Sequence, residues 1–147
     1  MTYTGTQAFS GRGTQIEIGN VFPSPTAYIP IEEVNKCSPS GNKLDTDDAS
    51  NFESGINKEL ISTMRDNGEI KLDGNFLPTA TGQLALQAAL QTGQLNNFKL
   101  VFASGPNGGY DFTGYVTSFE PDIPVDKFVK FTASIKITGP FVWTSTP

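Results

Sequence analysis

The sequence contains no histidine and a single cysteine, Cys37, in 147 residues. Without histidine, the chain lacks the usual general base of serine and cysteine nucleophiles and a common ligand of transition metals. One cysteine forms no internal disulfide, which excludes a disulfide-stapled secreted scaffold. We therefore interpret Cys37 as a small, buried or half-buried apolar residue rather than a reactive thiol, because no imidazole is present to activate it.

Long hydrophobic runs and basic clusters are also missing. No stretch approaches the roughly 18 consecutive apolar residues of a membrane helix, and the N-terminus lacks the basic-then-apolar order of a signal peptide. Lys and Arg number 10 against 15 Asp and Glu, which gives a net charge of −5. Such a charge disfavours adhesion to a phosphate backbone. We expect a soluble protein, without a membrane segment, that is retained where it is made.

The composition is that of one globular domain. Hydrophobic residues make up 37%, with eleven Phe, and charged residues 17%. This length supports one core and is too short for two ordinary domains. We expect a single domain over residues 1–147, with a flexible arm at 1–13, a long loop at 39–56 and a helix at 79–93.

The clearest periodic signal lies in residues 129–138, "VKFTASIKIT". Apolar and polar residues alternate there without a break, which predicts a long strand with one buried face. The polar side of this strand is a candidate subunit-interface surface. Its candidate residues are Lys130, Thr132, Ser134 and Lys136.

Other segments predict further antiparallel strands. Residues 59–65 and 69–76 flank Asp66-Asn-Gly68, a hairpin turn signal, and are expected to pair with each other. Residues 97–104 and 110–119 flank "GPNGG" and predict a second hairpin. Two earlier strands are expected in "TQIEIG" and "AYIPIEEVN", the second at a sheet edge because Pro30 cannot donate to a ladder.

One helix is predicted, in "TATGQLALQAALQTG". Its Ala, Leu and Gln content favours helix, Thr79 or Thr81 is a candidate N-cap, and Gly93 stands where a left-handed C-terminal residue belongs. An apolar face wide enough to cover one sheet surface or barrel end is expected. Its members are Leu84, Leu86, Ala88, Ala89 and Leu90.

The expected loop contains the acidic run "LDTDDASN" at residues 44–51. An EF-hand beginning at Asp45 fails, because its fifth, sixth and twelfth positions are Ala49, Ser50 and Ile56. The run is therefore either a solvated loop on an outer surface or a contact with another protein. The candidate interface residues are Asp45, Thr46, Asp47, Asp48 and Ser50.

Catalytic chemistry finds little support. A pair of carboxylates can hydrolyse glycosides, but it requires two acids with distinct environments in a cleft, whereas Asp-rich runs in loops are usually solvated. The glycine clusters at 11–19 and 104–109 neither lead from a strand into a helix nor carry the P-loop lysine, so both predict turns. We expect no enzyme activity and no cofactor. Phe141 and Trp143 are expected to cap the core.

The order of elements over residues 66–140 carries a family resemblance. A "DNGEIKLDGNF" segment is followed by the helix "TGQLALQAALQTGQ", by "FKLVF" and by "YDFTGYVTSFEPDIPVDKFVKFTASIKITGP". This order resembles the C-terminal part of the tail tube (major tail) proteins of long-tailed bacteriophages. The family string F-x-G-x-V-x-S-F is matched by Phe112, Gly114, Val116, Ser118 and Phe119. Less specifically, residues 45–50 followed by Gly55-Ile56 resemble the family's long loop.

The resemblance implies a structural virion subunit, with an antiparallel β-sandwich or partial barrel and one flanking helix. It implies hexameric rings of this chain that stack into a hollow tail tube, assembled in the host cytoplasm and found in the virion. In such a tube the polar side of residues 129–138 is a candidate lining of the lumen. It also implies contacts with tape measure, tail tip or baseplate, and tail terminator proteins. DNA would pass through the tube without adhering, to which the net negative charge is suited.

Two alternatives remain open. The first is a β-sandwich module that binds carbohydrate or a protein ligand through a loop such as "GPNGGY", with Tyr110 or Trp143 in contact with the ligand. The second is a tube subunit of a related secretion or injection machine, which would pass proteins in place of DNA. Assembly into tubes separates the first alternative from the tail tube, and the charge of the channel separates the second.

Overall fold

The computed structural model describes residues 8–103 and 108–145. These residues form nine strands and one helix. In chain order they are β1 (Gln15–Gly19), β2 (Tyr28–Pro30), β3 (Val34–Ser40), β4 (Lys43–Asp48), β5 (Leu60–Asp66), β6 (Glu69–Asn75), α1 (Thr81–Thr92), β7 (Asn96–Phe102), β8 (Gly108–Asp122) and β9 (Lys130–Ser145).

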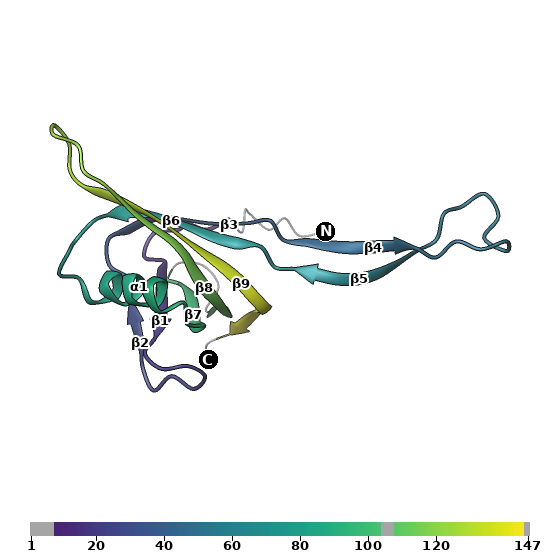
Figure 1. Cartoon of the computed structure of the whole chain (residues 1–147), viewed down its shortest axis with the longest axis horizontal. Helices are drawn as coiled ribbons and strands as arrows, with labels where there is room; N and C mark the ends of the chain where they lie inside the picture. Colours follow the sequence, from purple (N-terminus) through teal and green to yellow (C-terminus); the bar gives the residue numbers. More distant parts are fainter. Residues whose placement is uncertain (1–7, 104–107, 146–147) are drawn as a thin grey trace, which may run out of the picture.

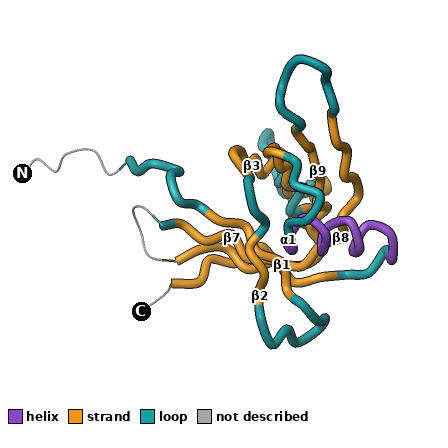
Figure 2. The backbone as a smooth tube through the Cα atoms, turned by 90° about the vertical axis from the view of Figure 1, so that its left-hand side faces the viewer, coloured by secondary structure: helices purple, strands orange, loops and turns teal. Residues whose placement is uncertain are grey.

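Seven of the strands form one antiparallel sheet in the order β2-β1-β7-β8-β9-β6-β3, while β4 and β5 form a separate two-stranded sheet. The large sheet curls from β2 and β1 round to β3 (Figure 2). Within the described ranges its edge strands β3 and β2 are not paired with each other, so the domain is a partial barrel. The expected class, mainly antiparallel β with a single helix, is confirmed.

The core lies inside the curl of the sheet, where alternate residues of every long strand meet. β9 shows the predicted alternation, with Phe131, Ala133, Ile135 and Ile137 buried between exposed or half-buried polar neighbours. β7 and β8 pair as expected, and Phe98 of β7 stacks on Phe112 of β8 with ring centroids 5.5 Å apart. Most of the turn between these strands lies outside the described residues.

The expected hairpin through Asp66-Asn-Gly68 is wrong. β5 pairs with β4, whereas β6 pairs with β3 on one side and with β9 on the other. Gly68 has the positive φ of 80° that a turn signal implies. The chain nevertheless continues past it, from β5 straight into β6, because the buried face of β6 pairs in the core sheet with β3 and β9, while the exposed β5 pairs with the strand before it. The expected loop over 39–56 is also wrong in part, since β4 occupies residues 43–48.

The helix ends as predicted, with Gly93 in the left-handed conformation and its N–H bonded to the carbonyl of Ala89. Its beginning differs: the N-cap is Ala80, which has no side-chain cap, and Glu32 accepts the N–H of Gly82 instead, at 3.0 Å from Oε2. Of the expected apolar face, Leu86 and Ala89 are buried and Leu90 is half-buried, whereas Leu84 and Ala88 are exposed.

Gln83 takes the place in the core that Leu84 was expected to fill. Its side chain is completely buried and makes three hydrogen bonds. Nε2 donates to the carbonyls of Glu32 at 3.0 Å and Asn75 at 2.9 Å, and Oε1 accepts the N–H of Leu77 at 2.9 Å. This amide therefore ties α1 to the segment before β3 and to the end of β6. α1 itself packs mainly on β8.

Two hairpins project from the domain in opposite directions (Figure 1). One is formed by β4 and β5 and extends far from the core. The other is the distal part of the β8–β9 hairpin, beyond the last paired residues Asp122 and Lys130. No helix in the described part of the chain is long and apolar enough to cross a membrane.

Candidate assembly surface

The most prominent surface feature is the projecting segment 41–67, which we call the arm. It consists of β4, β5 and the tip loop 49–59, and nearly all of its residues are exposed. The arm leaves the body at two glycines of positive φ, Gly41 at 79° and Gly68 at 80°. A Cβ on Gly68 would lie 2.0 Å from the carbonyl oxygen of Ser40, so the two strands cross this joint in close backbone contact.

The joint is fastened to β9 by side chains and backbone. Asp66 accepts the N–H of Gly68 at 2.8 Å and pairs with Lys136 Nζ at 3.1 Å. Asn67 Nδ2 donates to the carbonyl of Gly139, and Ile137 N–H donates to the carbonyl of Gly68. The Gly68 hydrogen bond, together with Lys136, lowers the pKa of Asp66 from its ordinary value of 3.8. These contacts fix the base of the arm relative to β9, although the strands of the arm are exposed to solvent.

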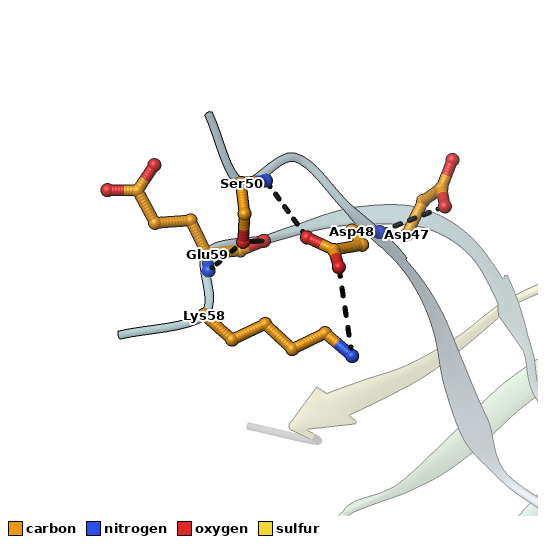
Figure 3. Close-up of polar contacts among 5 residues, drawn as sticks. All are labelled: Asp47, Asp48, Ser50, Lys58 and Glu59. Atoms are coloured by element: carbon orange, nitrogen blue, oxygen red, sulfur yellow. Dashed lines mark hydrogen bonds and ion pairs between the residues drawn. The ribbon is translucent and has the colours of Figure 1, made fainter. Parts of the chain in front are cut away.

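The acidic candidates belong to β4 and the residues after it, and Figure 3 shows Asp47, Asp48 and Ser50 at the end of that strand. Asp45, Thr46, Asp47 and Asp48 are exposed residues of β4, and Ser50 follows the strand. Asp48 accepts the N–H of Ser50 at 2.9 Å, and these contacts with Ser50 lower the pKa of the carboxyl group. Ser50 Oγ accepts the N–H of Glu59 at 2.8 Å, which closes the tip loop across the strands.

Positive charge beside these carboxylates is sparse. Lys58 Nζ lies 3.8 Å from Asp48 Oδ2, and both side chains are solvated, so this pair contributes little to stability. Among the residues that the structure describes, Asp45 and Asp47 have no ion pair, and no group of three or more acidic, Cys or His side chains could hold a metal ion. The run is thus a solvated acidic surface available for contact.

Apolar side chains are exposed on both faces of the arm. Phe52 and Ile56 in the tip loop are fully exposed, with relative accessibilities of 108% and 102%. Several large apolar side chains exposed on one projecting segment indicate an interaction site. The remaining exposed apolar residues of the arm are Leu44, Leu60, Ile61 and Met64. Sequence reasoning missed this surface, because the segment was expected to be an irregular acidic loop and a covered strand.

The polar side of β9 is placed as expected, on the outer face of the sheet. Lys130, Thr132 and Lys136 are exposed and Ser134 is half-buried. Thr132 Oγ1 lies 3.2 Å from Asp73 Oδ1 on the neighbouring strand β6, and Lys136 is paired with Asp66. This face therefore carries both charges. Lys136 is paired with a carboxylate, whereas Lys130 has no ion pair in the described part of the chain and lies over the Phe128 ring, 5.0 Å from its centroid.

The distal end of the β8–β9 hairpin also presents apolar side chains: Ile123, Val125 and Phe128 are exposed. At the other end of β9, Phe141 packs on the core as expected and stacks on Tyr110 at 4.4 Å. Trp143 is only half-covered, at 39% accessibility, and stacks on Phe102. The prediction that both residues cap the core is confirmed for Phe141, whereas Trp143 is exposed and is not among the residues that pack on the core.

The sole cysteine lies beside a surface groove and is half-buried, as expected. Burial raises the pKa of the Cys37 thiol to about 11, so it is protonated near neutral pH and is a poor nucleophile.

Comparison with known proteins identifies the relatives of this chain. A family model described as the lambda phage tail tube protein (TTP) matches residues 10–144. No curated protein matches the sequence. Among solved structures, the tail of an empty gene transfer agent (GTA) particle with C6 symmetry is 17% identical, with a TM-score of 0.73 over 92% of this chain and 98% of that chain.

Two further tubes have the same fold. The SPP1 tail tube is 14% identical, with a TM-score of 0.65 over 90% of this chain and 77% of that chain. The sheath–tube complex of an extracellular contractile injection system (PVC) is 13% identical, with a TM-score of 0.61 over 90% and 88% of the two chains.

Proposed function

Because this chain belongs to the lambda phage tail tube protein family, we propose that its subunits close into six-membered rings that stack around a hollow channel. Its role as a structural subunit of a tail tube follows from the family. The ring and its six-fold symmetry are supported by the similar GTA tail, which has C6 symmetry.

The observation that carries the proposal is a pair of incomplete strand edges. β7 pairs with β8 up to Gly114, so residues 115–122 of β8 have no strand on that side in the described part of the chain. On the opposite side of the hairpin, β6 pairs with β9 from Lys130 to Lys136, which leaves residues 140–145 without a strand partner there. Two different free edges suit a head-to-tail ring, in which the β8 edge of one subunit pairs with the β9 edge of the next and the backbone hydrogen-bonding groups of both edges find partners.

In such a ring the polar face of β9 and β6 lines the channel. A wall that conducts DNA must not hold it, and two lysines of this face lie beside carboxylates: Lys71 Nζ is 3.9 Å from Glu69 and Lys136 Nζ is 3.1 Å from Asp66. Lysines paired in this way release few counterions to phosphate and so bind DNA weakly. During genome ejection the DNA thus passes along a wall that does not bind it, and this passage requires neither catalysis nor a cofactor.

The arm supplies a second kind of contact between subunits, in addition to the strand pairing that closes the ring. Its carboxylates Asp45, Asp47 and Asp48, with Thr46 and Ser50, face an adjacent subunit or ring and pair with basic residues there. Assembly occurs in the host cytoplasm, and tape measure, tail tip or baseplate and terminator proteins fix the length and ends. Similar tube folds occur in a sheath/tube terminator structure and in a tube-terminating cap.

The family match favours this function over a ligand-binding module, for which most of the "GPNGG" loop lies outside the described residues. It also favours a phage tail over an injection machine, although the two share a fold.

Negative-stain electron microscopy of the concentrated protein tests the proposal. Tubes with a central channel are expected, either spontaneously or with a nucleating tail tip. Channel-free particles, or no ordered assembly under any nucleation, would contradict it.

A further inference from the structure

The joint of the arm contains Asn67-Gly68, one of two Asn-Gly pairs in the sequence; the other begins at Asn107, outside the described residues. An asparagine that precedes glycine is open to attack within the chain, because glycine has no side chain that shields its backbone nitrogen. Asn67 is half-buried, so water reaches its side chain, whereas Gly68 is buried. The pair is therefore a candidate site of covalent modification.

The modification is a deamidation, and water is the only reactant besides the protein. The Gly68 nitrogen loses its proton to water or hydroxide and forms a bond to Asn67 Cγ. The Cγ–Nδ2 bond then breaks, and Nδ2 takes up a proton and leaves as ammonia, so that a cyclic imide remains. A water molecule opens this ring at either of its carbonyl carbons, which leaves aspartate or isoaspartate at position 67.

Both reacting groups are hydrogen-bonded in the closed joint. Gly68 N–H donates to Asp66 Oδ1 at 2.8 Å, and Asn67 Nδ2 donates to the carbonyl of Gly139 at 2.6 Å. Attack requires the Gly68 nitrogen to become negative, and the adjacent carboxylate disfavours a second negative charge. The Asn67 bond holds the leaving group against β9, so its departure breaks this contact as well. The closed joint therefore opposes both deprotonation and the loss of ammonia.

The backbone around Gly68 is packed too closely to rearrange while the joint is closed. A Cβ on this residue would lie 2.0 Å from the carbonyl oxygen of Ser40 and 2.9 Å from the nitrogen of Asn42. On the other side, the Gly68 carbonyl accepts the N–H of Ile137 at 3.0 Å. Ring closure turns the peptide plane between Asn67 and Gly68, and this packing resists that turn. Deamidation therefore requires the joint to open first.

Opening of the joint is a local event, because β4 and β5 are exposed along nearly their whole length. The side-chain bonds of Asp66 and Asn67 and the Ile137–Gly68 backbone bond fasten the joint, and each is expected to contribute only about 1 kcal/mol. Segments with few buried contacts open with free energies far below that of global unfolding. When opening and closing are fast relative to the chemistry, the rate of deamidation follows the population of the open joint.

We propose that Asn67 is a deamidation site that the closed joint protects and the open joint exposes, with Asp66 as the residue that protects it. The change also prevents the joint from closing again. The product carboxylate has no N–H to donate to Gly139 and adjoins the Asp66 carboxylate, so repulsion replaces a hydrogen bond. Isoaspartate in addition inserts a methylene into the main chain between β5 and β6. In the proposed tube, subunits that deamidate before assembly are lost to it; this consequence alone rests on the proposed function.

The first test needs no variant. The full-length protein is incubated at mildly alkaline pH, and mass spectrometry of its peptides measures conversion at Asn67, with isoaspartate quantified by enzymatic methylation. The same protein in guanidinium chloride gives the unprotected rate. Conversion should be at least about 10-fold slower in the folded protein, since opening the joint costs its hydrogen bonds. Equal rates in the two conditions, or no conversion at Asn67 in denaturant, would overturn the proposal.

The second test removes the protecting carboxylate. Each variant's rate is divided by its own rate in denaturant, which corrects for the changed neighbouring sequence. Asp66→Ala should deamidate roughly 10-fold faster than the wild type, the equivalent of about 1.4 kcal/mol. Asp73→Ala is the matched control, because Asp73 accepts its hydrogen bond from Thr132 at the far end of β6, away from the joint. Equal acceleration by both substitutions would refute the role of Asp66.

The third test concerns the product. Asn67→Asp carries its charge, and amide exchange at Ile137, whose N–H is bonded to Gly68, should accelerate in this variant. Asn57→Asp adds the same charge at an exposed position of the tip loop and should leave that exchange unchanged. Unchanged exchange in Asn67→Asp, or equal acceleration in both variants, would show that the joint survives deamidation and would overturn this part of the proposal.

Assembly is a separate measurement. Tubes that incorporate deamidated subunits as readily as fresh ones would contradict the consequence for assembly while leaving the proposed function intact. If the wild type forms no tubes at all, the proposed function fails, whereas the rates and exchange measured on the monomer still test the site.

Discussion

Replacing Gln83 with Leu should destabilise the isolated subunit far more than the same substitution at an exposed glutamine of the helix. The side chain is completely buried, and its amide satisfies the carbonyls of Glu32 and Asn75 and the N–H of Leu77. Leu has a similar volume, so it fills the space but leaves three backbone groups without partners. At about 1 kcal/mol for each hydrogen bond, we expect a loss of roughly 3 kcal/mol in the free energy of unfolding.

Urea unfolding of the monomer measures this difference, with Gln91→Leu as the matched control on the exposed part of the same helix. The control should change stability by less than about 0.5 kcal/mol. Thermal unfolding should show a decrease of roughly 6–12 °C for Gln83→Leu, on a scale of about 2–4 °C per kcal/mol for a domain of this size. A loss below about 1 kcal/mol, or equal effects of both substitutions, would refute the role assigned to this amide.

Three further predictions concern the arm and its joint. Because the folded-state pKa of Asp66 is lowered below 3.8, its stabilising contacts are complete above that pH and are lost as the pH falls through the lower folded value. Amide exchange at Gly68, corrected for the intrinsic rate, should therefore accelerate at low pH in the wild type, whereas Asp66→Asn should exchange faster already at pH 7; a wild-type response retained in the variant would contradict this. Gly68→Ala should lower the thermal stability by at least about 2 kcal/mol, since its Cβ would meet the Ser40 carbonyl at 2.0 Å in a left-handed conformation, and an unchanged melting temperature would contradict the close contact. Deleting residues 43–66 should leave a monomer of nearly unchanged stability that forms no tubes, because Ser40 and Glu69 already pair and four residues remain to connect them; normal tubes from this variant would disprove the role of the arm.

The sequence predicted the elements whose pattern is local and strong. The alternation of residues 129–138 identified β9, and Gly93 marked the end of α1 correctly. Strand pairing was harder, because Gly68 has the positive φ that a turn signal implies, yet β5 pairs with the preceding strand β4, and β6 pairs with β3 and with the distant β9. The amide of Gln83 was missed for a related reason, since its partner Glu32 is 51 residues distant.

The arm shows what the sequence could have revealed about the candidate site. In β5, Leu60 and Ile61 are adjacent apolar residues on opposite faces, and both are exposed. A strand that covers a core alternates, so the lack of a period of two was a signal that this strand belongs to no core. The acidic residues were found because charge is visible in the sequence. Phe52 and Ile56 were missed because their full exposure results from the projection of the arm, which the sequence does not show. The contact made by the acidic run stays a prediction.

The central claim is that this chain closes into six-membered rings around a channel, with the free edges of β8 and β9 joined between neighbours. Cryo-electron microscopy of tubes assembled from the purified protein, reconstructed without imposed rotational symmetry, tests it most directly. The account predicts six subunits per ring, continuous strand density from residues 115–122 of one subunit to residues 140–145 of the next, and an open channel faced by Lys130, Thr132, Ser134 and Lys136. Rings of another symmetry, or neighbours that meet without strand pairing, would contradict it.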